Sequence, residues 1–94
     1  MQDTAIDVRH DAARHRFSTL VDGVEAYVEY EPEDGALAIT HTIVPAPISG
    51  RGIAASLVRA AVDHARALGL KVRPACSYAA AWLRRHPEYG DLRA

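Results

Sequence analysis

The residues best suited to chemistry form a glycine turn at 47–54, with the sequence Pro-Ile-Ser-Gly-Arg-Gly-Ile-Ala. A strand-like apolar run (37–44) precedes the turn, and a run with helical periodicity (53–68) follows it. The first amides of a helix lack intrahelical partners, and the positive end of the helix dipole adds to them. Gly50 and Gly52 therefore predict a site for an anion such as a pyrophosphate. The alternative is a tight turn that binds nothing.

Two side chains outside the turn are candidates for nucleophilic or acid–base chemistry. Cys76 is the only cysteine, and it lies at the expected start of the last helix, where the helix dipole favours a reactive thiolate. The alternative role for Cys76 is that of a small buried hydrophobic residue. His41 is a candidate general base, because a free imidazole titrates near neutral pH. Its alternation matches that of Leu37, Ile39 and Ile43, so it faces either the core or a ligand cleft.

The hydrophobic pattern gives the elements that must position these residues. Polar residues dominate the N-terminal region, where a short strand is expected at Ile6–Arg9. Asp22-Gly23 predicts a hairpin turn, and Pro32–Gly35 predicts a second turn. The remaining pattern predicts strands at Arg16–Val21, Val24–Glu31, Leu37–Val44 and Lys71–Cys76, and helices at Gly52–Leu68 and Ser77–Arg85.

The order β-β-β-α-β-α predicts an α/β (α+β) fold with a mixed sheet. Its last strand–helix–strand unit is expected to be a right-handed parallel crossover. Such a crossover places the ends of strands 37–44 and 71–76 on the side of the sheet where open sheets bind ligands. The strand at 37–44 is apolar on both faces, as in a central strand. The apolar stripe of the first helix ends at Leu68, with Gly69 as its C-cap.

Bulk properties narrow the class of protein. The 94 residues predict one domain spanning 1–94. The net charge of −1 gives no indication of nucleic-acid binding. No apolar run approaches the roughly 20 residues that cross a bilayer, and we see no signal-peptide pattern or metal-binding Cys/His spacing. A single cysteine fits a reducing cytoplasmic location.

Several of these residues together resemble a known family. The segments Thr42-Ile43-Val44-Pro45, Gly50-Arg51-Gly52-Ile53-Ala54 and Leu57-Val58 resemble the acyl-CoA-binding motif of the GCN5-related N-acetyltransferases. The pattern is more specifically similar to the small single-domain branch of that superfamily, through His41, Val72–Pro74, Cys76 and the tail Arg85-His86-Pro87-Glu88-Tyr89. The similarity runs from about Arg16 to Leu92 and implies a GNAT-like fold.

The resemblance implies acetyl transfer from acetyl-CoA to an amine. It assigns the pyrophosphate of acetyl-CoA to the amides of Gly50, Arg51, Gly52, Ile53 and Ala54. It assigns the pantetheine arm to the backbone of Ile43 and Val44, between two parallel strands that splay apart. Cys76 would then act as nucleophile or proton relay, with His41 as a candidate base. The acceptor, a small molecule or a protein amine, stays open, and a monomer or weak homodimer is expected.

Three departures from the family pattern keep a second hypothesis open. Pro47 stands where Gln or Arg is usual, and Ile43 stands where the small branch often has Glu. Trp82 stands where the superfamily often has a Tyr that protonates the departing thiolate, so Tyr78, Cys76 or water would have to do so. Trp82 and Tyr78 either line the acyl pocket or pack the last helix on the sheet. The second hypothesis is a non-catalytic CoA-binding or regulatory module.

Overall fold

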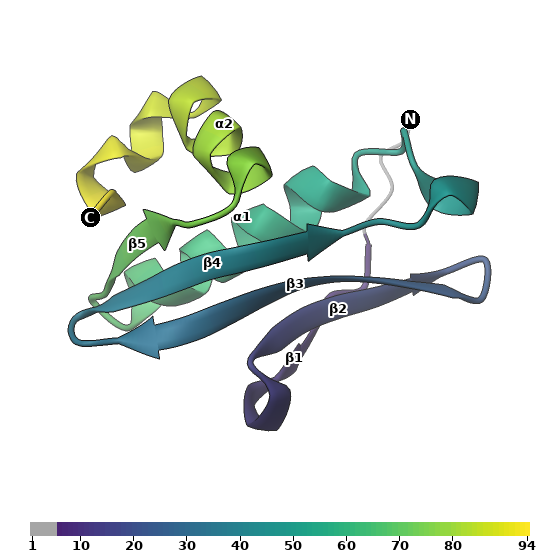
Figure 1. Cartoon of the computed structure of the whole chain (residues 1–94), viewed down its shortest axis with the longest axis horizontal. Helices are drawn as coiled ribbons and strands as arrows, with labels where there is room; N and C mark the ends of the chain where they lie inside the picture. Colours follow the sequence, from purple (N-terminus) through teal and green to yellow (C-terminus); the bar gives the residue numbers. More distant parts are fainter. Residues whose placement is uncertain (1–5) are drawn as a thin grey trace.

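The computed structural model describes residues 6–94. They contain a five-stranded sheet in the order β1-β2-β3-β4-β5, together with helices (Figure 1). The strands are β1 (Arg9–Asp11), β2 (Arg16–Val21), β3 (Val24–Glu33), β4 (Ala36–Ile43) and β5 (Lys71–Pro74). The helices are α1 (Ile53–Ala67) and α2 (Ser77–Arg85), with 3-10 turns η1 (Ala12–Arg14), η2 (Ala46–Ile48) and η3 (Pro87–Leu92). Within this sheet β4 and β5 pair in parallel, and the other neighbouring strands pair antiparallel. The predicted mixed sheet ending in a parallel unit is confirmed.

The central hairpin follows from local sequence. Asp22 and Gly23 join β2 to β3 with φ values of 52° and 76°, the signs that a type I′ hairpin turn requires. Along β3 the predicted face is buried at Ala26, Val28 and Tyr30. These residues point toward α1, which passes behind the sheet in Figure 1.

Several predicted boundaries in the sheet are wrong. β4 covers Ala36–Ile43 rather than Leu37–Val44, and β5 ends at Pro74 rather than at Cys76. β3 continues through Pro32 to Glu33, so the second turn is shorter than the predicted 32–35. β2 pairs with β3 only as far as Glu29, so β3 has a partner on one side alone at Pro32, where a missing N–H is tolerated. The first strand covers Arg9–Asp11 rather than Ile6–Arg9, because its register with β2 starts at Arg9.

Helix α1 supplies much of the core. The predicted stripe is buried at Ile53, Leu57, Val58, Ala61, Val62 and Ala65. Leu68 was expected to extend the stripe but is 58% exposed. The helix stops there in a Schellman arrangement: the Leu70 amide donates to the Ala65 carbonyl (2.9 Å) and the Gly69 amide to the Arg66 carbonyl (3.1 Å). Gly69 has a φ of 72°, which ends the helix before Leu68 can turn inward.

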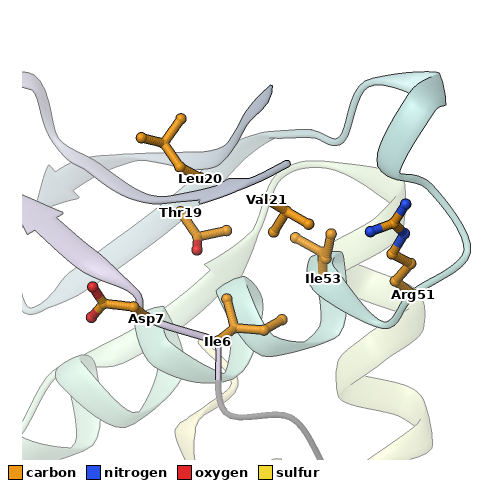
Figure 2. A pocket seen from close by; sticks show the side chains of 7 residues that line it. All are labelled: Ile6, Asp7, Thr19, Leu20, Val21, Arg51 and Ile53. Atoms are coloured by element: carbon orange, nitrogen blue, oxygen red, sulfur yellow. The ribbon is translucent and has the colours of Figure 1, made fainter. Parts of the chain in front are cut away.

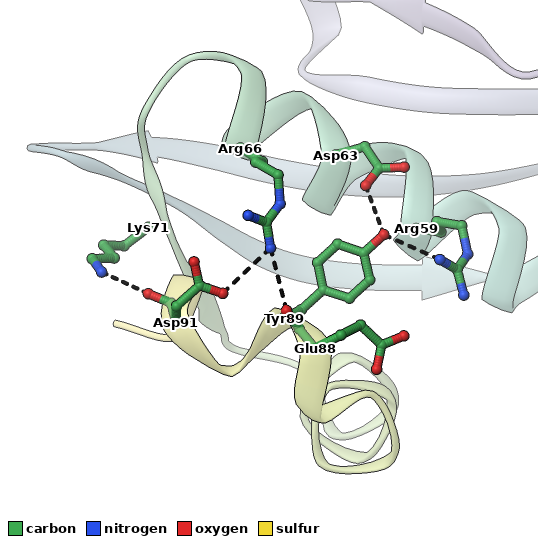
Figure 3. Close-up of polar contacts among 7 residues, drawn as sticks. All are labelled: Arg59, Asp63, Arg66, Lys71, Glu88, Tyr89 and Asp91. Carbon is green, nitrogen blue, oxygen red and sulfur yellow. Dashed lines mark hydrogen bonds and ion pairs between the residues drawn. The ribbon is translucent and has the colours of Figure 1, made fainter.

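A polar cluster fixes the C-terminal turn η3 against α1 (Figure 3). The Tyr89 hydroxyl donates to Asp63 Oδ1 (2.8 Å) and accepts from Arg59 Nη1 (3.1 Å). Arg66 Nη2 donates to Asp91 Oδ1 at 3.3 Å. The Ala94 amide also donates to the Val72 carbonyl on β5 (2.8 Å). These contacts hold the end of α2 in place, because η3 follows α2 directly.

One irregularity in β4 decides which side chains face the core. Glu29 pairs with His41, yet the next residue of β3, Tyr30, pairs with Ile39. Thr40 is therefore an extra residue in β4, a β-bulge. Each extra residue reverses the alternation of the strand beyond it.

Beyond the bulge, Thr42 lies opposite Val28 and so shares the core-facing side with Ile39. His41 and Ile43 lie on the other face, where His41 is exposed and Ile43 is 42% exposed. The prediction that His41 and Ile43 share the alternation of Leu37 and Ile39 is therefore wrong. The predicted burial of both faces of β4 holds only for its first half, at 36–39.

Candidate functional site

The glycine turn has the backbone that its sequence predicts. After β4, η2 uses the amides of Ile48 and Ser49 in bonds to the carbonyls of Pro45 and Ala46 (3.1 and 3.2 Å). Gly50 and Gly52 then adopt φ values of 78° and 76°, a region that favours glycine. A Cβ atom at either position would meet no atom within 4 Å. Both glycines are thus required by the backbone conformation, and the space in front of them is open.

The amides of this turn are free to bind a ligand. Within residues 6–94, the N–H groups of Gly50, Arg51, Gly52, Ile53 and Ala54 donate no hydrogen bond. The first bond of α1 runs from the Ser56 amide to the Gly52 carbonyl at 3.2 Å. Gly52 is the N-cap and has no side chain to satisfy the first turn. A group of unpaired donors therefore lies at the positive end of a 15-residue helix.

These amides border a cavity of about 290 Å³, here called the turn cavity. It is lined by Val44, Ser49, Gly50, Gly52, Ile53, Ala54, Ala55 and Tyr78. Val44, Gly50, Gly52, Ile53 and Ala54 are among the predicted cofactor residues, whereas the predicted Ile43 and Arg51 do not line it. Ser49 and Ala55 were not predicted, although both are direct neighbours of residues that were.

Arg51 turns to the other flank of the glycine turn. Its Nη1 atom donates to Asp22 Oδ2 at 2.8 Å, at the tip of the β2–β3 hairpin. Together with Ile6, Asp7, Thr19, Leu20, Val21 and Ile53, it lines a larger hollow of about 450 Å³ (Figure 2). The larger hollow has no His, Cys or Tyr among these residues, so we place the candidate site in the smaller turn cavity.

Beside the turn cavity, the two parallel strands part. Their pairing ends where Ile39 meets Pro74, and the last bond joins the Ala75 amide to the Ile39 carbonyl (2.9 Å). Across the rest of the described chain, no main-chain hydrogen bond joins residues 40–44 to anything after Ala75. We call this gap between 40–44 and 75–76 the strand wedge. Its free edge on β4 provides the unpaired main-chain groups that an extended ligand can pair with.

Cys76 lies at the strand wedge, as predicted. It is the N-cap of α2, and its Sγ atom accepts a bond from the Ala79 amide at 3.4 Å. The same Sγ lies 3.4 Å from Thr42 Oγ1 on β4. The cysteine is half-buried and packs against the edge of the core. The sulfur therefore has polar partners, and the residue that carries it is partly exposed.

His41 does not join Cys76. It faces away with Glu29 and lines a separate small hollow of about 210 Å³. The side chain that β4 directs to the sulfur is instead that of Thr42. From the sequence Thr42 stands out only as part of the family motif, with no role of its own, because the bulge at Thr40 leaves no local signal.

The two aromatic candidates on α2 lie in different surroundings. Tyr78 lines the turn cavity, and burial raises its pKa above the ordinary value, opposed in part by Arg85. Its phenol therefore keeps its proton at neutral pH and is able to donate a hydrogen bond. Trp82 packs in the core at 3% exposure and stacks on His86 with ring centroids 3.9 Å apart. Its indole Nε1 has no hydrogen-bond partner in the described part of the chain.

Comparison with known proteins fits this geometry. The family model for GCN5-related N-acetyl-transferase matches residues 16–92. The chain belongs to the GCN5-related N-acetyltransferases. The match covers the same span as the resemblance predicted from the sequence. The expected family and fold are therefore confirmed.

Individual relatives are similar to this chain over most of its length. Protein NATD1 of Xenopus tropicalis is 33% identical over 87 residues, which cover 89% of this chain and 80% of the relative. Protein NATD1 of Mus musculus is 34% identical over 89 residues, covering 92% and 81%. The NMR structure of a GCN5-like protein from Staphylococcus aureus aligns with a TM-score of 0.75 at 26% identity, covering 95% of this chain and 88% of that one.

Residues 6–94 offer neither a membrane-spanning helix nor a cluster of metal ligands. No helix there has the length and apolar character to cross a membrane. No cluster of three or more His, Cys, Asp or Glu side chains in that range could hold a metal ion.

Proposed function

We propose that this chain takes the acetyl group of acetyl-CoA and transfers it to an amine, with Cys76 as the nucleophile. The observation that carries the proposal is the row of unpaired amides at Gly50–Ala54, which borders the turn cavity beside the strand wedge. Cys76 lies at that wedge with its sulfur toward β4. Val44 and Tyr78, which line the turn cavity, lie two residues beyond Thr42 and Cys76, and this supports a single ligand that reaches both the donors and the nucleophile.

Main-chain groups supply the contacts that bind acetyl-CoA. The amides of Gly50–Ala54 suit the oxygens of a pyrophosphate, and the α1 dipole adds to them. The free edge of β4 at Ile43 and Val44 offers main-chain partners to the pantetheine arm, in the manner of an added strand. Acetyl-CoA, held this way, supplies an acetyl group activated as a thioester. The open space before both glycines fits this role, because any Cβ there would occupy it.

Cys76 performs the first transfer. Its thiolate sulfur forms a bond to the acetyl carbonyl carbon while the bond from that carbon to the CoA sulfur breaks. Tyr78, two residues after Cys76, lines the turn cavity and keeps its proton, so its phenol donates a hydrogen bond to the departing thiolate. Tyrosine is one of the side chains that act as general acids toward a leaving group.

The second transfer regenerates the cysteine. A neutral amine attacks the acetyl-Cys76 carbonyl carbon, and the carbon–sulfur bond to Cys76 breaks to release the thiolate. The amine loses one proton and the CoA thiolate gains one, so the products are an amide and CoA thiol. The acceptor is proposed only as an amine, of a small molecule or of a protein.

The test is whether Cys76 becomes acetylated and passes the acetyl group on. Purified protein is mixed with acetyl-CoA, and intact-mass and peptide mass spectrometry follow an adduct on Cys76 that hydroxylamine removes. Amine panels are then scored for acetylation. Cys76→Ser is the matched variant, since Ser is a strong N-cap and keeps α2 intact, whereas Cys76→Ala costs about 1 kcal/mol at an N-cap.

The outcomes separate the hypotheses. We expect the adduct and amine acetylation in the wild type, with both lost in Cys76→Ser while acetyl-CoA binding is retained. Undiminished amine acetylation by Cys76→Ser would mean direct transfer without the cysteine. Binding of acetyl-CoA with neither adduct nor product would favour the non-catalytic CoA-binding module. No binding would refute the assignment of the turn cavity.

A further inference from the structure

The bulge in β4 selects the side chain that meets Cys76. With strict alternation from Ile39, His41 would face the core side and Thr42 would face away. The extra residue at Thr40 reverses this, so that Thr42 lies opposite Val28 on the core side. A one-residue irregularity thus brings a hydroxyl, in place of an imidazole, to the strand wedge.

The sulfur of Cys76 has two polar partners on different elements. Thr42 Oγ1 lies 3.4 Å away on β4, and the Ala79 amide donates from 3.4 Å away on α2. No other hydrogen bond within residues 6–94 uses the Thr42 hydroxyl. A hydroxyl both accepts and donates, so it can accept from the thiol and donate to the thiolate. Once the sulfur is ionised, the Thr42 hydroxyl joins the Ala79 amide as a donor to it.

Charged side chains are not the partners of this sulfur. Among the described residues, no ion pair or hydrogen bond links Cys76 to Asp, Glu, Lys, Arg or His. Tyr78, two residues along α2, stays neutral because burial raises its pKa. His41, the other titratable group nearby on β4, faces the opposite side of the sheet with Glu29.

We propose that Thr42 is the positioning residue for the Cys76 nucleophile. Its hydroxyl donates to the ionised sulfur, increases the reactive thiolate fraction and holds the sulfur at the strand wedge. The proposal deepens the proposed function, because it takes Cys76 as the reacting group. Its central claim about the thiolate is tested without acetyl-CoA, so the two can fail separately.

The experiment measures the rate at which iodoacetamide alkylates Cys76 in the free protein, at pH 7 and at pH 10. Wild type is compared with Thr42→Val, which removes the hydroxyl at nearly constant shape, and Thr42→Ser, which keeps it. We expect Thr42→Val to react about five-fold more slowly at pH 7, the order of one lost hydrogen bond. Thr42→Ser should stay within about two-fold, since its hydroxyl is retained.

The rate at pH 10 separates ionisation from access. Every ordinary thiol is largely ionised there, so all three proteins should react within about two-fold of one another. An equal slowing of Thr42→Val at both pH values would show an effect on access alone and overturn the proposal. So would a wild-type rate for Thr42→Val at pH 7, or a Thr42→Ser rate as slow as that of Thr42→Val.

A second variant keeps the test valid if Thr42→Val does not fold. If circular dichroism shows that Thr42→Val is misfolded, Thr42→Ala takes its place with the same expected rates. With acetyl-CoA, acetylation of Cys76 should slow by the factor seen in alkylation at pH 7. Absence of acetylation in the wild type would refute the proposed function, while the alkylation result would still decide the role of Thr42.

Discussion

The substitution Gly52→Ala tests the anion site most directly. Gly52 has a φ of 76°, and a Cβ there would meet nothing within 4 Å. The substitution should therefore lower the free energy of unfolding only through the left-handed backbone, by about 1 kcal/mol for an L-residue. For a chain of this size that corresponds to a melting temperature lower by about 4–8 °C.

The effect on the ligand should be larger than the effect on the fold. The new methyl group projects into the open space where the phosphates must approach the amides of residues 50–54. Losing one hydrogen bond to a charged group costs about 1.5–3 kcal/mol. The Kd for CoA should therefore rise about ten- to one-hundred-fold, measured by titration calorimetry at a temperature where both proteins are folded.

Gly69→Ala is the matched control. Gly69 also has a positive φ, of 72°, and a Cβ there would likewise meet nothing within 4 Å. It lies at the opposite end of α1 from the glycine turn. We expect the same loss of melting temperature and an unchanged Kd for CoA. The reasoning is refuted if Gly52→Ala binds CoA as the wild type does, or if both variants weaken binding equally.

Two further predictions concern stability. Tyr89→Phe removes the bonds to Asp63 and Arg59 that join η3 to α1, so urea denaturation should show a loss of about 1 kcal/mol; an unchanged midpoint would mean that this contact adds nothing. Burial, followed by the nearby His64, lowers the pKa of His10, so the unfolded chain binds more protons than the folded one between the lowered pKa and about 6.5. Stability should therefore be fully present above about pH 6.5 and fall as the pH drops from there toward the lowered pKa. His10→Gln should flatten the dependence of the urea midpoint on pH over that range, and equal slopes in the two proteins would argue against this role.

The elements with local signals were predictable from the sequence. β2 has its predicted bounds because Asp22-Gly23 specifies a tight hairpin turn at its end. α2 has its predicted bounds because Pro87 follows soon after its last turn. The glycine turn was also predictable, since its two left-handed residues must be glycine whatever surrounds them.

Features that depend on pairing with distant residues were not predictable. Pro32 reads locally as a turn residue, but β3 continues through it because β2 no longer pairs there. The bulge at Thr40 depends on how β4 registers with β3, and its residues carry no glycine or proline to mark it. The errors at His41 and Ile43 follow directly, because an uninterrupted alternation would place both on the same face as Leu37 and Ile39.

The two halves of the candidate site therefore depend on the sequence in different ways. The binding half consists of main-chain amides, so most side chains at Ile53 and Ala54 would present the same donors, and only Gly50 and Gly52 are constrained by the backbone. The reacting half requires two side chains, Thr42 and Cys76, to meet across the strand wedge at 3.4 Å. That meeting depends on the bulge in β4 on one side and on the placement of α2 by η3 on the other. A relative could thus keep the glycine turn and CoA binding while a single residue gained or lost in β4 removed the hydroxyl from the sulfur.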